Sequence, residues 1–133
     1  MYFCLTVLLL IVPVGFMGCS KPIEHNEELA GKRALEFAEI TLIKQNFDEG
    51  YALLANKARS YVPVETFKKT VSRLHPDGYP STLTVTKFKP MLEEKALYVY
   101  LRGENSGREF HYTLTLNGTA ASDYQVSVID RTR

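Results

Sequence analysis

Side chains that favour a buried position recur every three or four residues through the first half of the chain, the spacing of one face of an α-helix. The pattern predicts three helices, over residues 27–45, about 46–59 and about 64–74. Asn26 is expected to cap the first, and Asn46 and Glu49 have capping-box spacing at the start of the second. The inward positions are Ala30, Ala34, Phe37, Ala38, Thr41 and Leu42, then Tyr51, Leu54, Ala55 and Ala58, then Phe67, Val71 and Leu74.

From Ser81 onward the period of the pattern changes to two, which is typical of β-strands. Four strands are predicted, over residues 81–89, 96–102, 108–117 and 123–130. A hairpin loop is expected over residues 103–107, and Asn117-Gly118 begins the turn before the fourth strand. Consecutive strands joined by short turns pair antiparallel, so the sequence predicts a meander sheet.

Alternation along the strands assigns their side chains to two faces of this sheet. The predicted core face, covered by the helices, holds Leu97, Val99, Leu101, Phe110, Tyr112, Leu114, Leu116, Tyr124, Val126 and Val128. The opposite face, called the outer face below, is expected to carry Tyr98, Tyr100, Arg102, His111, Thr113, Thr115, Gln125, Ser127 and Ile129. The expected fold class is therefore α+β, with three N-terminal helices packed on one face of a four-stranded antiparallel sheet.

A short apolar run, Leu5 to Met17, precedes this pattern and ends in Gly18-Cys19-Ser20. The run is too short to span a bilayer, which takes about 20 residues, but its length and its small residues before Cys19 are typical of a secretory signal. The segment resembles a lipobox, the recognition site of bacterial lipoprotein signal peptidase. The resemblance implies a signal peptide over residues 1–18 and a lipid on Cys19. Residues 19–26 would then be a polar tether to the folded domain.

The lipobox resemblance also implies a place in the cell. The protein would be anchored in the cell envelope by the lipid on Cys19, and Ser20 in place of Asp implies the outer membrane, facing the periplasm, in a Gram-negative source. Cleavage would remove Cys4 and leave no second thiol for a disulfide. Two other interpretations stay open: Cys19 is an ordinary buried thiol, or residues 1–18 remain as an uncleaved anchor.

Charge is nearly balanced over the 133 residues, with 16 basic and 15 acidic side chains and a formal net charge of +1. Such a balance provides no strong field for nucleic acid, so no nucleic-acid partner is expected. Lys68, Lys69 and Arg73 are interpreted as a solvated helix face, with attraction to lipid head groups as the alternative.

Two short stretches carry a resemblance to a known fold family. They are Asn46-Phe47-Asp48-Glu49-Gly50-Tyr51-Ala52-Leu53-Leu54 at the second helix and Val62-Pro63-Val64-Glu65-Thr66-Phe67 at the third. With the order of elements, they are similar to the nuclear transport factor 2-like superfamily, which has a cone-shaped, cystatin-like fold, and especially to its small bacterial lipoproteins of unknown function. The resemblance covers about residues 27–131 and implies a single domain of this type over residues 27–133.

Enzymes of that superfamily, such as ketosteroid isomerase and scytalone dehydratase, place an Asp or His inside the cone. Here the pattern offers no interior His, and Asp130 is in phase with the core face only near the chain end. No catalytic residue and no cofactor are predicted. No metal site is predicted either, because no two of the three histidines have the spacing of metal ligands. The residues expected to line or fill the cone are Phe37, Leu54, Phe67, Phe110, Tyr112 and Tyr124.

The outer face offers the better candidate site. Tyr98, Tyr100, Arg102 and His111 share it, and Tyr and Arg are enriched at protein interfaces. The family resemblance implies that this face could form a homodimer; a solvated face is the alternative. We therefore expect a non-catalytic binding or scaffolding lipoprotein with a homodimeric or envelope-protein partner. The alternative is an enzyme of the ketosteroid isomerase or dehydratase type acting on a small hydrophobic molecule in the cone.

Overall fold

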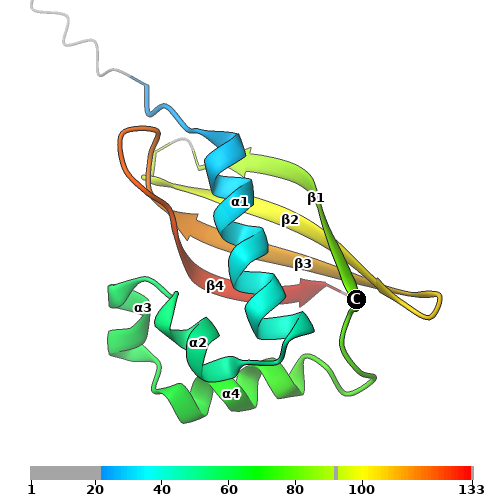
Figure 1. The fold of residues 1–133 in the computed structure, drawn as a ribbon. Helices are drawn as coiled ribbons and strands as arrows, with labels where there is room; N and C mark the ends of the chain where they lie inside the picture. Colours follow the sequence, from blue (N-terminus) through cyan, green and yellow to red (C-terminus); the bar gives the residue numbers. More distant parts are fainter. Residues whose placement is uncertain (1–21, 92, 133) are drawn as a thin grey trace, which may run out of the picture.

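The computed structural model describes residues 22–91 and 93–132, and the apolar N-terminal run and Cys19 lie outside this part. All its helices precede its strands (Figure 1). The elements are α1 (Glu27–Ala38), the π-helical turn η1 (Glu39–Ile43), α2 (Phe47–Ala52), α3 (Asn56–Tyr61), α4 (Val64–Arg73), β1 (Thr82–Pro90), β2 (Ala96–Asn105), β3 (Arg108–Asn117) and β4 (Gln125–Thr132). The domain is thus α+β, with four α-helices and one antiparallel sheet in the order β1-β2-β3-β4.

Helix α1 lies diagonally across one face of the sheet and contacts all four strands (Figure 1). As predicted, Asn26 caps it, with the side-chain oxygen accepting from Leu29 N at 3.1 Å. Its buried stripe is mostly of small residues, which lets the helix backbone approach the strands. At Gly31 there is little room for a side chain, since a Cβ there would lie 3.1 Å from Phe88 Cζ. The buried positions of α1 are Ala30, Gly31, Ala34, Phe37 and Ala38.

The single helix expected over residues 46–59 is two short helices, α2 and α3. The chain between them meets the edge of the sheet: Leu54 forms a parallel bridge with Val126, and Ala55 N donates to Val126 O at 2.8 Å. The Ala55 N–H is thus bonded to β4 and cannot continue the helix. The predicted cap is present, because Asn46 accepts from Glu49 N at 3.2 Å and donates to its carboxylate at 2.8 Å.

The hairpin between β2 and β3 is tighter than the sequence suggested. Gly103, expected in the loop, is a buried strand residue, and the strands continue to Asn105 and Arg108. The turn is only Ser106-Gly107, both with positive φ (51° and 79°), which suits the twist of paired strands. A Cβ at Gly103 would lie 2.7 Å from Pro80 Cβ, so glycine here serves close packing.

A β-bulge in β4 changes which of its residues face the core. The register passes from Leu116↔Val126 to Thr115↔Val128, so Ser127 is the extra residue and the alternation reverses after it. The predictions for the end of β4 were therefore wrong. Val128 lies on the outer face and is 54% exposed, whereas Ile129 packs against the core. Asp130 pairs with Thr113 on the outer face and is exposed, so it is not an interior acid.

Residues 22–26, the described part of the expected tether, lie against the β3–β4 loop. Ala120 N donates to Glu24 O at 2.8 Å, and Asn26 N donates to the buried Tyr124 hydroxyl at 2.9 Å. His25 Nδ1 lies 3.1 Å from the same hydroxyl. The chain is thus bonded to the domain from Glu24 onward, before α1 begins.

Gly50 and Thr41 give a direct test of the packing between η1 and α2. A methyl group at Gly50 would collide with Thr41 Oγ1, which has no hydrogen-bond partner among the described residues. We expect Gly50→Ala to lower the free energy of unfolding by about 1–3 kcal/mol despite alanine's better helix propensity.

Thr41→Ala provides the control for this prediction, since it removes the colliding hydroxyl. Alone, it should change the free energy of unfolding little. In combination with Gly50→Ala, it should restore much of the lost stability, which appears as a coupling energy in a double-mutant cycle of urea unfolding. Additive effects of the two substitutions would contradict this account of the contact.

Candidate functional site

The six residues expected to line the cone are all buried in one hydrophobic core, together with the inward side chains of β2 and β3. Phe37 and Tyr124 border a surface hollow of about 280 Å³, and Leu54 and Phe67 border another of about 220 Å³. Phe110 and Tyr112 stack on each other at 6.5 Å within the core. These side chains therefore fill the space beneath the helices.

One interior histidine was missed by the sequence analysis. His75 follows α4 and is only 5% exposed, although the pattern placed all three histidines on loops or the surface. Its Nδ1 lies 2.6 Å from Val71 O and its Nε2 lies 2.7 Å from the Tyr112 hydroxyl. The ring also stacks on Tyr79, with 4.3 Å between centroids. The prediction failed because the His-Pro-Asp-Gly sequence is typical of an exposed turn.

Hydrogen bonding fixes the protonation of this pair. A backbone carbonyl only accepts, so the His75 Nδ1 carries the proton and the Nε2 lone pair accepts from the Tyr112 hydroxyl. Burial lowers the pKa of His75 and raises that of Tyr112, and the nearby Arg131 charge also lowers the His75 pKa. Both groups are thus neutral and satisfied by each other at neutral pH, as expected of a structural core pair.

Arg131 closes the sheet end beside this pair, where the bulge turns it inward opposite Tyr112. Its guanidinium donates to Leu74 O at 2.6 Å and to both carboxylate oxygens of Asp77, at 2.7 and 3.0 Å. It also lies 4.5 Å from the centre of the Phe110 ring. The ion pair lowers the pKa of Asp77 and raises that of Arg131. This contact ties the turn after α4 to the end of β4.

The four residues predicted for an interface do share the outer face. Tyr98 and Tyr100 are half-buried neighbours on β2, with 6.5 Å between ring centroids. Arg102 and His111 are direct cross-strand partners. Tyr98 and Tyr100 pair with Thr115 and Thr113 on β3.

The outer face is divided into an apolar and a charged part. Val128 adds an exposed aliphatic side chain on β4, opposite Thr115 in the strand register. At the hairpin end, Arg102 pairs with Glu104 and with Glu109 at 2.6 Å, and His111 Nε2 lies 3.4 Å from Glu109. The hydrogen bond from Arg102 and its positive charge lower the pKa of Glu109. The tyrosines and Val128 are the apolar members of this face, although Lys87 Nζ lies 5.8 Å from the centre of the Tyr100 ring and Lys89 is opposite Tyr98 in the strand register.

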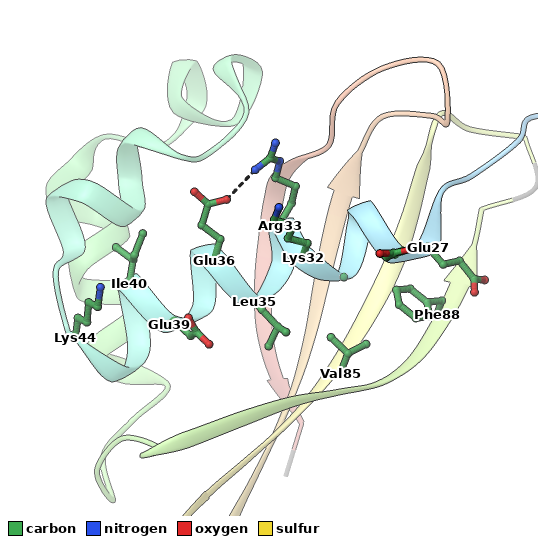
Figure 2. Close-up of a pocket in the computed structure, with 12 residues that line it drawn as sticks. Glu27, Lys32, Arg33, Leu35, Glu36, Glu39, Ile40, Lys44, Val85 and Phe88 are labelled. Carbon is green, nitrogen blue, oxygen red and sulfur yellow. Dashed lines mark hydrogen bonds and ion pairs between the residues drawn. The ribbon is translucent and has the colours of Figure 1, made fainter.

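An open groove of about 810 Å³ separates α1 from the edge strand β1 (Figure 2). In Figure 2, Leu35 of the helix and Val85 and Phe88 of the strand point into it, while charged residues stand along the helix. The groove exists because α1 crosses the sheet at an angle, a tertiary feature that the sequence pattern did not reveal. Its charged residues are Glu27, Glu28, Lys32, Arg33, Glu36, Glu39 and Lys44.

The three histidines are not brought together, and within residues 22–91 and 93–132 no cluster of metal-ligating side chains is found. Among those same residues, no helix combines the length and apolar character that crossing a bilayer requires. Comparisons with protein-family models, with curated proteins and with solved structures find nothing that matches this chain. For the residues that the structure describes, the geometry defines the class: a small α+β domain with a filled interior and one sheet face that none of its helices covers.

The buried His75 leads to a pH dependence of stability. Its folded pKa lies below the ordinary value of 6.5, so between the two pKa values the unfolded chain binds more protons. The stabilising contribution is complete above about pH 6.5 and falls as the pH drops toward the folded pKa. One proton limits the slope to about 1.4 kcal/mol per pH unit. Urea unfolding between pH 7.5 and pH 5 should show this loss.

His75→Gln should remove that part of the pH dependence, whatever it does to stability at neutral pH. Tyr112→Phe is the matched control, because it deletes the hydroxyl bound to the ring but keeps the buried imidazole. It should keep a loss of stability below about pH 6.5. An unchanged slope in His75→Gln would show that other groups cause the acid sensitivity.

Proposed function

We propose that the chain is a lipid-anchored binding domain of the bacterial cell envelope, attached to the membrane through Cys19 and without catalytic activity of its own. The observation that carries the binding role is the uncovered outer face, where Tyr98, Tyr100 and Val128 gather apolar surface on an otherwise polar sheet. Exposed apolar groups with a polar border are typical of interaction sites. The anchor rests on the Gly18-Cys19-Ser20 sequence.

A nuclear transport factor 2-like identity for the domain is part of the proposal. It is supported by helices that precede a four-stranded meander and by a long first helix across one sheet face. The resemblance at Asn46–Leu54 and Val62–Phe67 falls on α2, the bridge to β4, and the start of α4. Cys19 followed by Ser20 favours the outer membrane, facing the periplasm, if the source is Gram-negative.

The filled interior supports binding rather than catalysis. An enzyme of the ketosteroid isomerase or dehydratase type needs a cone with room for its substrate and a free acid or base. Here Phe37, Phe67 and Phe110 occupy the core, and the buried His75 is bonded on both ring nitrogens. Asp130, the one interior acid that the pattern offered, is on the outer face.

The anchor is tested by the intact mass of the protein extracted from bacterial membranes. We expect a chain that begins at Cys19 and carries diacylglycerol, with or without a third, amide-linked acyl chain such as palmitate. Cys19→Ala should abolish both the acyl mass and membrane retention, because the variant lacks the thiol that is modified. An unmodified chain that still begins at Met1 would refute the lipoprotein assignment.

The binding face is tested by a photo-crosslinking amino acid placed at Tyr100 in cells that express the anchored protein. We expect a cross-linked band, at twice the mass for a second copy or at another mass for an envelope protein. Tyr61 is the matched control, since it is 76% exposed but lies on α3. Equal cross-linking at the two positions, or none at Tyr100, would contradict the assignment of this face.

A further inference from the structure

The start of the described chain is bonded to one end of the domain. Residues 22–26 are fixed at two points on the β3–β4 loop: Ala120 N donates to Glu24 O, and the Tyr124 hydroxyl accepts from Asn26 N. The ring of Tyr124 is buried, so the second point belongs to the core. Figure 1 shows the chain entering beside this loop, at the end opposite the β2–β3 hairpin. Glu24 therefore has a fixed place on the domain, and Pro22 lies two residues before it.

The distance from Pro22 to the proposed lipid is short. Only Ser20 and Lys21 separate Pro22 from Cys19, and three Cα–Cα steps reach at most about 11 Å. Acyl chains on Cys19 would enter the bilayer, so Pro22 would stay within about that distance of the lipid surface. A polar tether of eight residues would allow free tumbling, but a link this short does not.

The surface around Pro22 can lie close to lipid at little cost. Pro22, Ile23, Ala120 and Ala121 are apolar and at least partly exposed, and with Thr119 and the exposed, charged Glu24 they line a shallow hollow of about 430 Å³ between the two segments. The neighbouring β1–β2 turn is bonded to the same end, with Gly118 N donating to Lys95 O at 2.8 Å. Its charges, Glu93, Glu94 and Lys95, include both signs, so contact with lipid depends on the anchor and not on a basic patch.

We infer that the end formed by residues 22–24 and 119–121 rests on the surface of the bilayer and fixes how the domain stands on it. This inference depends on the proposed lipid at Cys19. Strands β2 and β3 then lead away from the membrane, and a ten-residue strand places the β2–β3 hairpin up to about 33 Å farther out. The outer face stands upright beside the bilayer, with Tyr98 and Tyr100 accessible from the side.

The experiment places a single fluorescent label near or far from the expected contact. Ala121→Cys places the label at the lipid-facing end, and Ser106→Cys places it at the hairpin. In the acylated protein each new cysteine is the sole free thiol, since Cys4 is removed and Cys19 is modified. The full lipoprotein is purified from membranes, its acyl mass is checked, and it is reconstituted into phosphatidylcholine vesicles that contain a lipid with a nitroxide head group. We expect the nitroxide to quench the fluorescence of a label at residue 121 several-fold more strongly than that of a label at residue 106.

A longer link provides the matched variant. Ten Gly and Ser residues inserted between Lys21 and Pro22 keep every bond of residues 22–26 but add a flexible chain with a span of about 18 Å. Quenching at 121 should then fall toward the value at 106. Tyr124→Phe, which keeps the buried ring and removes the hydroxyl that holds Asn26, should lower quenching at 121 in the same direction.

The outcomes separate the two proposals. Equal quenching at 121 and 106 in a protein with the acyl mass would overturn the fixed orientation and leave the anchored binding domain standing. If quenching at 121 stays stronger than at 106 with the inserted link, the contact with the bilayer is supported and the short connection is overturned as its cause. Absence of the acyl mass would overturn both the anchor and the orientation.

Discussion

The close packing of α1 on the sheet is the constraint on which the other features depend. Ala30, Ala34 and Ala38 are fully buried, and the missing side chain of Gly31 lets Phe88 approach the helix. A helix this close can cross all four strands, so it excludes water from most of one face and makes the interior a packed core. Its diagonal course also leaves β1 partly uncovered, which produces the groove of Figure 2, and it brings the N-terminal residues beside the β3–β4 loop.

Features set by local periodicity were predictable, whereas features set by a departure from periodicity were not. The long first helix, its Asn26 cap, the four strands and the outer tyrosines all follow from spacing alone. The bulge at Ser127 does not, because the β-branched residues around it suit either face, and so Val128, Ile129 and Asp130 were assigned to the wrong sides. The break at Leu54 was likewise invisible, since it is caused by pairing with a strand about 70 positions later in the chain.

The candidate sites also divide into those that the sequence pattern predicts and those that it does not. The outer face was recognisable because strand alternation predicts which side chains share a surface. The His75–Tyr112 pair was not recognised, although one indication was present: an inward tyrosine in a core needs a partner for its hydroxyl, and a nearby histidine can supply it. The groove and the docked N-terminal residues depend on the angle and position of α1, which come from three-dimensional packing.

The bridge at Leu54 has a consequence for how the sheet can associate. An open edge strand exposes backbone groups to which another chain can add a strand. At β4, Leu54 and Ala55 already occupy that position beside Val126. At β1, a register shift between Val85 and Lys87, two exposed lysines and a terminal proline make the other edge a poor template. Because both edges are unsuited to adding a strand, the sheet resists the strand-by-strand growth that leads to fibres. This would be an advantage if the proposed anchor holds the protein at high local density on a membrane.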